Sequence, residues 1–156
     1  MCNRIGTERG GLGGRGHPLG YWLFVPVTVL TIGRSLVHLF APDGGAQSIA
    51  TIPLDRMTQG GAEGVIGVFA LWGLSQLLLG FVYVAVLLRF TNLLPLMYLL
   101  LIVEYVGRFA IGAAKPVPHL STPPGATANL VFPLIGAVGL WLSTRRSVPA
   151  TDEHAG

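Results

Sequence analysis

Charge and cysteine are both scarce in this sequence. Only 11% of its 156 residues are charged, whereas 51% are hydrophobic, and this balance excludes an ordinary soluble domain. The single cysteine, Cys2, cannot close an internal disulfide, so a disulfide framework is excluded as well. Lysine is nearly absent, since Lys115 is the only one, and this preference for arginine is typical of a GC-rich bacterial source.

What the chain has instead is long apolar segments. Each is close to the roughly 20 residues that a helix needs to cross a bilayer, and they cover residues 19–40, 64–88, 93–114 and 126–143. None alternates apolar and polar residues as a barrel strand would, so helices are the expected spanning structure. The sequence predicts an all-α, integral membrane four-helix bundle over residues 19–143. Disordered tails are expected on either side, a basic one at 1–18 and another at 144–156.

The few positive charges predict the orientation. The face that carries both tails would hold Arg4, Arg9, Arg15, Arg89, Arg145 and Arg146. The opposite face has only Arg56 and Lys115. We therefore expect a multi-pass protein of the inner (plasma) membrane with both termini cytoplasmic, and no nucleic-acid partner. Aromatic residues typical of the cytoplasmic interface support this orientation: Tyr21, Trp22 and Trp141. A cleaved signal peptide at 19–40 is the alternative, although the flank before it is long.

The two loops predicted to face outward differ in character. Residues 41–63 contain a mildly amphipathic stretch at 49–54 that is expected to lie along the membrane surface. Residues 115–125, KPVPHLSTPPG, contain four prolines and should be extended and stiff, either as a lid or docking surface or as a plain connector. In the N-terminal tail, GLGGRG at 11–16 matches the dinucleotide-binding fingerprint formally, but no strand precedes it, so we interpret the match as accidental.

Polar residues interrupt two of the predicted spanning helices. Glu104 and Arg108 are four residues apart, so they share a helix face and are expected to form an ion pair. A second polar stripe, at i, i+3, i+4 and i+7, must face protein or water because lipid would not tolerate it. It consists of Thr31, Arg34, Ser35 and His38.

Counting from the helix ends places these groups at one depth, together with Gln76 and the neighbouring Ser75. Close approach of the helices around this layer is expected at Gly73, Gly80, Gly136 and Gly139. The predicted intramembrane site therefore consists of Thr31, Arg34, Ser35, His38, Gln76, Glu104 and Arg108.

The charges of this predicted cluster do not balance. Two arginines, with His38 as a potential third cation, face Glu104 as the only acid at that depth. The missing anion could come from Asp43 or Asp55 in the outer loop, from backbone carbonyls near Pro133, or from an external anionic or carbonyl-bearing ligand. Three interpretations stay open: a structural network, a ligand site, and a proton or ion path through His38 and Glu104.

Catalysis and metal binding find little support in the sequence. No serine or cysteine lies in a known nucleophile motif, and no recognised metal-ligand spacing is present. A metal held by His38 and His119 is conceivable, but we predict no metal and, on balance, no enzyme.

The arrangement of motifs resembles a known group of proteins. The chain resembles the DoxX-like group of small four-helix bacterial membrane proteins in three features. These are an arginine late in the first helix, a following loop rich in proline and glycine, and the pair Gly107 and Arg108 followed by Lys115 and Pro116. The resemblance covers residues 19–143. It implies a four-helix bundle and, for some relatives, an association with quinone or redox chemistry, but it supplies no catalytic residues.

Two functional hypotheses follow. The first is a non-catalytic accessory or interaction subunit of a membrane assembly, in contact with lipid and with other membrane chains or copies of itself. The second is binding of a lipid, quinone or small anion in an outward-opening pocket around Arg34, His38, Gln76, Glu104 and Arg108. No cofactor is predicted, although a quinone or lipid would suit such a pocket. A proton-coupled transporter is a weaker alternative, because the sequence has no internal repeat.

Overall fold

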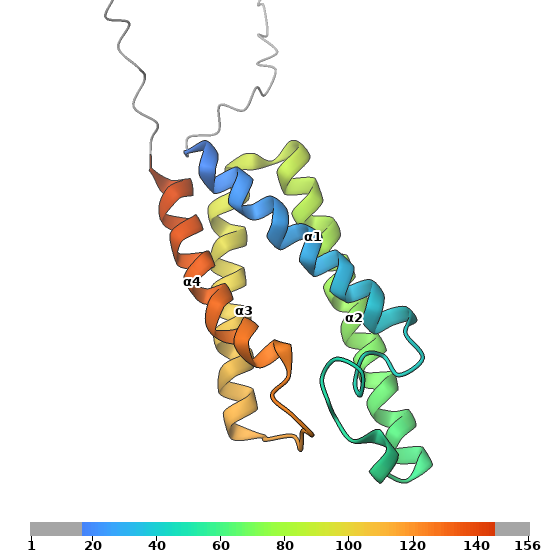
Figure 1. Ribbon diagram of the computed structural model, residues 1–156. Coiled ribbons are helices and arrows are strands. Elements are labelled where there is room, and N and C mark those ends of the chain that lie inside the picture. The colour runs from blue at the N-terminus through green and yellow to red at the C-terminus, as the bar shows by residue number, and fades with distance from the viewer. Residues whose placement is uncertain (1–16, 146–156) are drawn as a thin grey trace, which may run out of the picture.

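Residues 17–145 fold into four long helices joined by loops (Figure 1). The computed structural model describes residues 17–145. Its helices are α1 (Pro18–Phe40), α2 (Gln59–Arg89), α3 (Leu94–Ala114) and α4 (Pro124–Thr144), and two short 3₁₀ helices are η1 (Leu54–Arg56) and η2 (Thr91–Leu93). All four long helices have the length and apolar character needed to cross a membrane. The all-α prediction is therefore confirmed, while the orientation in the membrane stays a prediction and the two tails lie largely outside the described residues.

Helix α2 begins earlier than its hydrophobic pattern suggests. Its first residue is Gln59, whereas the apolar run starts at Gly64. Thr58 caps the helix, because its hydroxyl accepts a hydrogen bond from the amide of Gly61 at 3.3 Å. The first turn, Gln59 to Glu63, contains no large apolar residue, so the hydrophobic pattern alone places it in the loop.

The helices form two pairs. Helix α1 packs along α2 and α3 packs along α4, whereas α2 and α3 touch only sparsely. Helix α1 also crosses α4 near the end of the molecule where α1 begins and α4 ends, here called the terminal end (Figure 1). The loops between α1 and α2 and between α3 and α4 lie at the opposite end, the loop end. The two pairs are thus joined at the terminal end and need other contacts to stay together at the loop end.

A buried aromatic layer holds the terminal end together. The ring of Phe24 lies 4.8 Å from that of Tyr83 and 5.0 Å from that of Tyr98, both edge-on. The hydroxyl of Tyr98 donates to the carbonyl of Gly20 at 2.6 Å, so one side chain of α3 binds α1 by packing and by a hydrogen bond. All three rings are fully buried.

Glycines set the spacing inside each helix pair, as the sequence predicts. A Cβ at Gly73 would lie 2.7 Å from Cβ of His38, and one at Gly80 would lie 2.7 Å from Cγ1 of Ile32. In the other pair, Gly136 faces the side chain of Ile102 and Gly139 faces the ring of Tyr98 at similarly short range. Only a residue without a side chain fits these four positions, which lets the backbones approach closely.

The first loop folds back onto α2. Ile52 and Leu54 are buried in a small apolar cluster that includes Phe69 of α2. These two apolar side chains therefore pack against the protein, while the position of residues 49–54 relative to the membrane surface stays a prediction. The reason for this packing is a compact turn at Asp43, whose carboxylate accepts backbone hydrogen bonds from Gly45, Gln47 and Ser48. This turn uses positive φ angles at Gly44 and Gly45.

The two loops are joined to each other across the loop end. The hydroxyl of Thr51 donates to the carbonyl of Ser121 at 2.7 Å, and the backbone carbonyl of Thr51 accepts a hydrogen bond from the amide of Leu120 at 2.8 Å. Nδ1 of His119 hydrogen-bonds the carbonyl of Ala50 at 2.8 Å. We call this set of contacts between residues 50–51 and 119–121 the loop clasp. Thr51 adopts a φ of 57°, which is rare for a β-branched residue, so the clasp holds a strained backbone.

Candidate functional site

Side chains from three helices form a continuous polar network in the middle of the molecule. Nη2 of Arg34 donates to Oε1 of Gln76 at 3.1 Å, and Nε2 of Gln76 donates to Oε1 of Glu104 at 2.9 Å. The same oxygen of Glu104 forms the predicted ion pair with Arg108. Nη1 of Arg34 also donates to the hydroxyl of Tyr105 at 3.3 Å. We call these five residues the arginine cluster.

The other members of the predicted site lie nearby but outside this network. The hydroxyls of Thr31 and Ser35 donate to carbonyls four residues earlier in α1, at 2.8 and 2.6 Å. Such bonds are common for these residues in helices, because the carbonyl is always within reach. His38 is buried, and its Nδ1 lies 2.7 Å from the carbonyl of Gly44. That oxygen can only accept, so Nδ1 carries a hydrogen and helps to hold the turn at Asp43. Ser75, exposed on α2, donates to the carbonyl of Leu71 and takes no part.

Aromatic rings complete the cluster. The guanidinium carbon of Arg108 lies 4.5 Å from the ring centre of Trp72 and 4.9 Å from that of Tyr105. The guanidinium of Arg34 lies 5.2 Å from the same Trp72 ring. Tyr105 in turn stacks on Phe132 of α4 at 4.6 Å. Sequence reasoning missed Trp72 and Tyr105, although a helical signal existed, since Trp72 precedes Gln76 by one turn and Tyr105 precedes Arg108 by three residues.

Among residues 17–145, Glu104 is the only acid that pairs with either arginine through the network. Asp43 does not, because its carboxylate accepts three backbone N–H groups in its own loop. Burial alone would raise the pKa of Asp43, but these N–H groups outweigh it and lower the pKa to about 2. Asp55 is exposed on η1, and within residues 17–145 neither arginine hydrogen-bonds a carbonyl near Pro133. The arginine cluster therefore keeps one more positive charge than negative charge.

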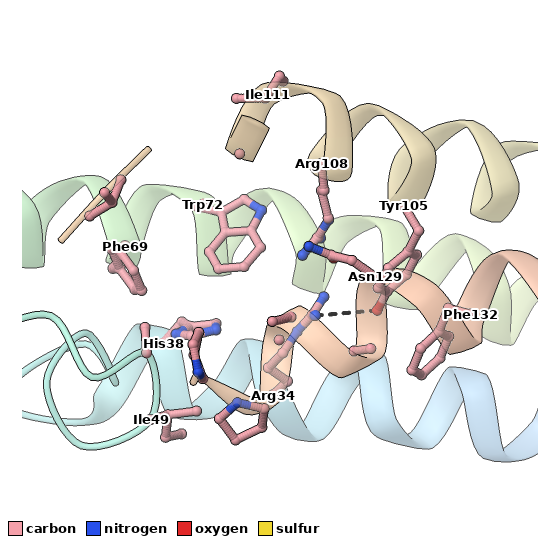
Figure 2. A pocket seen from close by; sticks show the side chains of 18 of the residues that line it. Arg34, His38, Ile49, Phe69, Trp72, Tyr105, Arg108, Ile111, Asn129 and Phe132 are labelled. Carbon is pink, nitrogen blue, oxygen red and sulfur yellow. Dashed lines mark hydrogen bonds between the residues drawn. The ribbon is translucent and has the colours of Figure 1, made fainter. Parts of the chain in front are cut away.

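A cavity of about 610 Å³ lies between the two helix pairs and reaches from this cluster to the loops. Figure 2 shows both guanidinium groups pointing into it beside Trp72, with Phe132 toward one end and His38 and Ile49 toward the other. Its basic lining side chains are Arg34, His38, Arg108, Lys115 and His119. Among the described residues that line it, no aspartate or glutamate occurs, and Glu104 is not one of the lining residues. Apolar residues make up most of the remaining wall.

Two histidines line this cavity. Nδ1 of His38 and of His119 each lies at hydrogen-bond distance from a backbone carbonyl. In the described part of the chain, no group of three or more His, Cys, Asp or Glu residues is close enough to hold a metal ion. The basic lining suits an anion better than a cation.

Comparison with known proteins adds no relative. No family model, no curated protein and no solved structure matches this chain. The resemblance to the DoxX-like group therefore stays a prediction, and the site has to be interpreted from its own geometry.

Proposed function

We propose that this protein binds an amphipathic ligand with an anionic head in the cavity between its two helix pairs. The observation that carries the proposal is the charge of the cavity lining. Arg34, Arg108 and Lys115 face the cavity, and its described lining residues include no carboxylate that would neutralise them. A net charge away from bulk water is costly unless a counter-charge lies close to it. An anion bound here would supply the missing charge.

The arginine cluster is well suited to hold such a head. Gln76 and Tyr105 fix the guanidinium of Arg34, while Glu104 and the ring of Trp72 fix that of Arg108. An arginine has five N–H donors, and these contacts use only one on each terminal nitrogen of Arg34. The second N–H of each nitrogen remains for a ligand oxygen. Because both guanidinium groups are already held in place, ligand binding would cost little additional side-chain entropy.

The rest of the cavity suits an apolar body. Its volume lies in the range of ~300–1,000 Å³ typical of small-molecule sites, which are mostly apolar with a few polar groups that orient the ligand. Leu30 and Ile111 line the cavity, and 59% and 64% of their surfaces are exposed. Both residues belong to helices long and apolar enough to cross a membrane, so we infer that the cavity opens toward lipid. A lipid-derived amphiphile could enter from the bilayer without crossing water.

Fluorescence of Trp72 provides the test. A variant with Trp22→Phe and Trp141→Phe leaves Trp72, which lines the cavity, as the only tryptophan. In lipid nanodiscs, a fatty acid brominated on its chain should quench this fluorescence with a saturable dependence on concentration. Arg34→Gln should weaken that binding at least tenfold while the helical circular dichroism is unchanged.

A matched control separates binding from partitioning. A second variant that keeps only Trp141, which is half-exposed and does not line the cavity, reports bromine that merely dissolves in the lipid. Its quenching should be linear and independent of Arg34. Linear quenching of equal strength at Trp72 would overturn the proposal.

An accessory or interaction subunit remains the second proposal. The observation in its favour is the sparse contact between α2 and α3, which leaves apolar side chains of both helices exposed. It predicts that the protein leaves the membrane with other chains in stoichiometric amounts. Native mass spectrometry after gentle extraction tests this, and a monomer carrying only a small molecule would contradict it.

A further inference from the structure

The charge of the cavity wall next to the arginine cluster depends on one carboxylate. Arg34 and Arg108 contribute two positive charges, and Glu104 contributes the single negative charge that both share through Gln76 and the ion pair. We propose that this makes the site selective for a monoanionic head group, and that Glu104 is the residue that determines the selectivity. The inference rests on the proposed ligand-binding function and specifies the ligand class.

The other charged groups do not alter this count. Lys115 is the exposed residue at which α3 ends, so its ammonium can reach water and be screened there. His119 is exposed in the loop clasp, and His38 points its Nδ1 at the carbonyl of Gly44. Asp43 is satisfied within its own turn. Only the three charges of the arginine cluster lie in the middle of the helices, where screening is weakest.

Charge matching at this depth discriminates between head groups. A carboxylate or a phosphodiester carries one negative charge and would make the cluster neutral. A phosphomonoester carries close to two charges above its second pKa of about 6, and would leave one negative charge uncompensated in a low-dielectric region. An alcohol or another neutral head would leave the positive charge as it is. The monoanion is therefore the favoured partner of the native cluster.

Two substitutions to glutamine change this count, and the first of them is isosteric. Glu104→Gln raises the cluster charge to two positive charges and keeps a side chain that Gln76 can hydrogen-bond. Arg108→Gln leaves Arg34 and Glu104, which cancel. The double variant leaves Arg34 alone and restores a single positive charge, so it should regain the native preference although both side chains have changed.

Competition against the brominated fatty acid measures the preference. The competitors carry one alkyl chain of the same length with a carboxylate, a phosphomonoester or a hydroxyl head, and recovery of Trp72 fluorescence in nanodiscs at about pH 8 reports displacement. The native protein should favour the carboxylate over both others at least tenfold. Glu104→Gln should shift the ratio at least tenfold toward the phosphomonoester, and Arg108→Gln should abolish the advantage of the carboxylate over the alcohol.

The outcomes separate this inference from the proposed function. Saturable binding with the same rank order in all four proteins would overturn the selectivity and leave ligand binding intact. Loss of saturable quenching in the native protein would remove the proposed function itself. If Glu104→Gln fails to fold, the comparison of Arg108→Gln with the double variant decides, because the first should lose the carboxylate preference only if Glu104 supplies the cancelling charge.

One further competitor identifies the source of the monoanion. A single-chain phosphodiester has the same charge as the carboxylate but a tetrahedral head. Displacement by both indicates that a membrane phospholipid or its lyso form can serve as the ligand, and displacement by the carboxylate alone indicates a free fatty acid. Either result supports a monoanion site, whereas equal displacement by the alcohol contradicts it.

Discussion

Gly73 provides the sharpest test of how the structure holds its site. It lies on α2 next to Trp72 and one turn before Gln76, and it faces α1 at His38. A Cβ at this position would lie 2.7 Å from Cβ of His38 and 3.1 Å from both the amide nitrogen of Leu39 and the carbonyl oxygen of Ser35. Two of these three atoms belong to the backbone of α1, so a side-chain rotation cannot relieve the contact. Gly73→Ala must push the two helices apart.

The cost follows from these distances. Carbon atoms make favourable contact at about 3.5–4.0 Å, so α1 and α2 would have to separate by roughly 1 Å along the line that joins Gly73 and His38. Overpacking of this kind typically costs about 1–3 kcal/mol, and the helix propensity of alanine returns up to ~1 kcal/mol. We expect a net destabilisation of about 1–2 kcal/mol, or roughly 2–8 °C in Tm for a chain of this size.

A control on the same helix isolates the effect. A Cβ at Gly67 would meet nothing within 4 Å, so Gly67→Ala should be neutral or slightly stabilising. Thermal unfolding of both variants in one detergent, followed by circular dichroism, gives the difference directly. Equal melting temperatures would refute the close approach of α1 and α2 at this layer, and with it the geometry that places Arg34 beside Gln76.

Three further predictions concern the polar groups. Glu104→Gln should lower the stability by about 2 kcal/mol, because Arg108 loses its counter-charge, and adding Arg108→Gln should recover at least half of that loss in thermal unfolding. The folded-state pKa of Asp43 is about 2, below its ordinary value of 3.8. Its carboxylate therefore stabilises the turn above about pH 4, and the protection of the amides at 45–48 against exchange, relative to an unfolded peptide at the same pH, should fall as the pH drops toward 2, but not in Asp43→Asn. In the loop clasp, Thr51→Val removes the hydroxyl donor to Ser121 and should speed exchange of the amide at 120 about fivefold; an unchanged rate would show that this bond contributes nothing.

The helical geometry explains what the sequence could predict about the site. The rise of a helix is fixed at about 1.5 Å per residue, so counting from the helix ends places Arg34, Gln76, Glu104 and Arg108 at one depth without knowledge of the packing. The four-residue spacing of Glu104 and Arg108 predicts their pairing for the same reason. The glycines are predictable too, because small residues at a helix interface allow close approach.

The sequence could not predict which of several possible partners each side chain contacts. The hydroxyls of Thr31 and Ser35 satisfy themselves on their own helix, so they leave the polar stripe that the spacing predicts. The helical spacing places Trp72 near Gln76 and Tyr105 near Arg108, but only the tertiary structure shows that both rings contact the arginines. Burial of Ile52 and Leu54 depends on the turn at Asp43, whose three hydrogen bonds are local but carry no periodic signal.

The arrangement of the helix pairs accounts for the position of the cavity. Contacts between the pairs are concentrated at the terminal end, where Tyr98 binds Gly20, and at the loop end, where the clasp joins the two loops. Between these points the pairs are bridged mainly by the arginine cluster, since Arg34 on one pair donates to Tyr105 on the other. A purely structural network would be most stable with its charges balanced and its space filled by apolar side chains. Here the bridge has an unbalanced charge and borders a cavity, which is the combination expected of a site that is completed by a ligand.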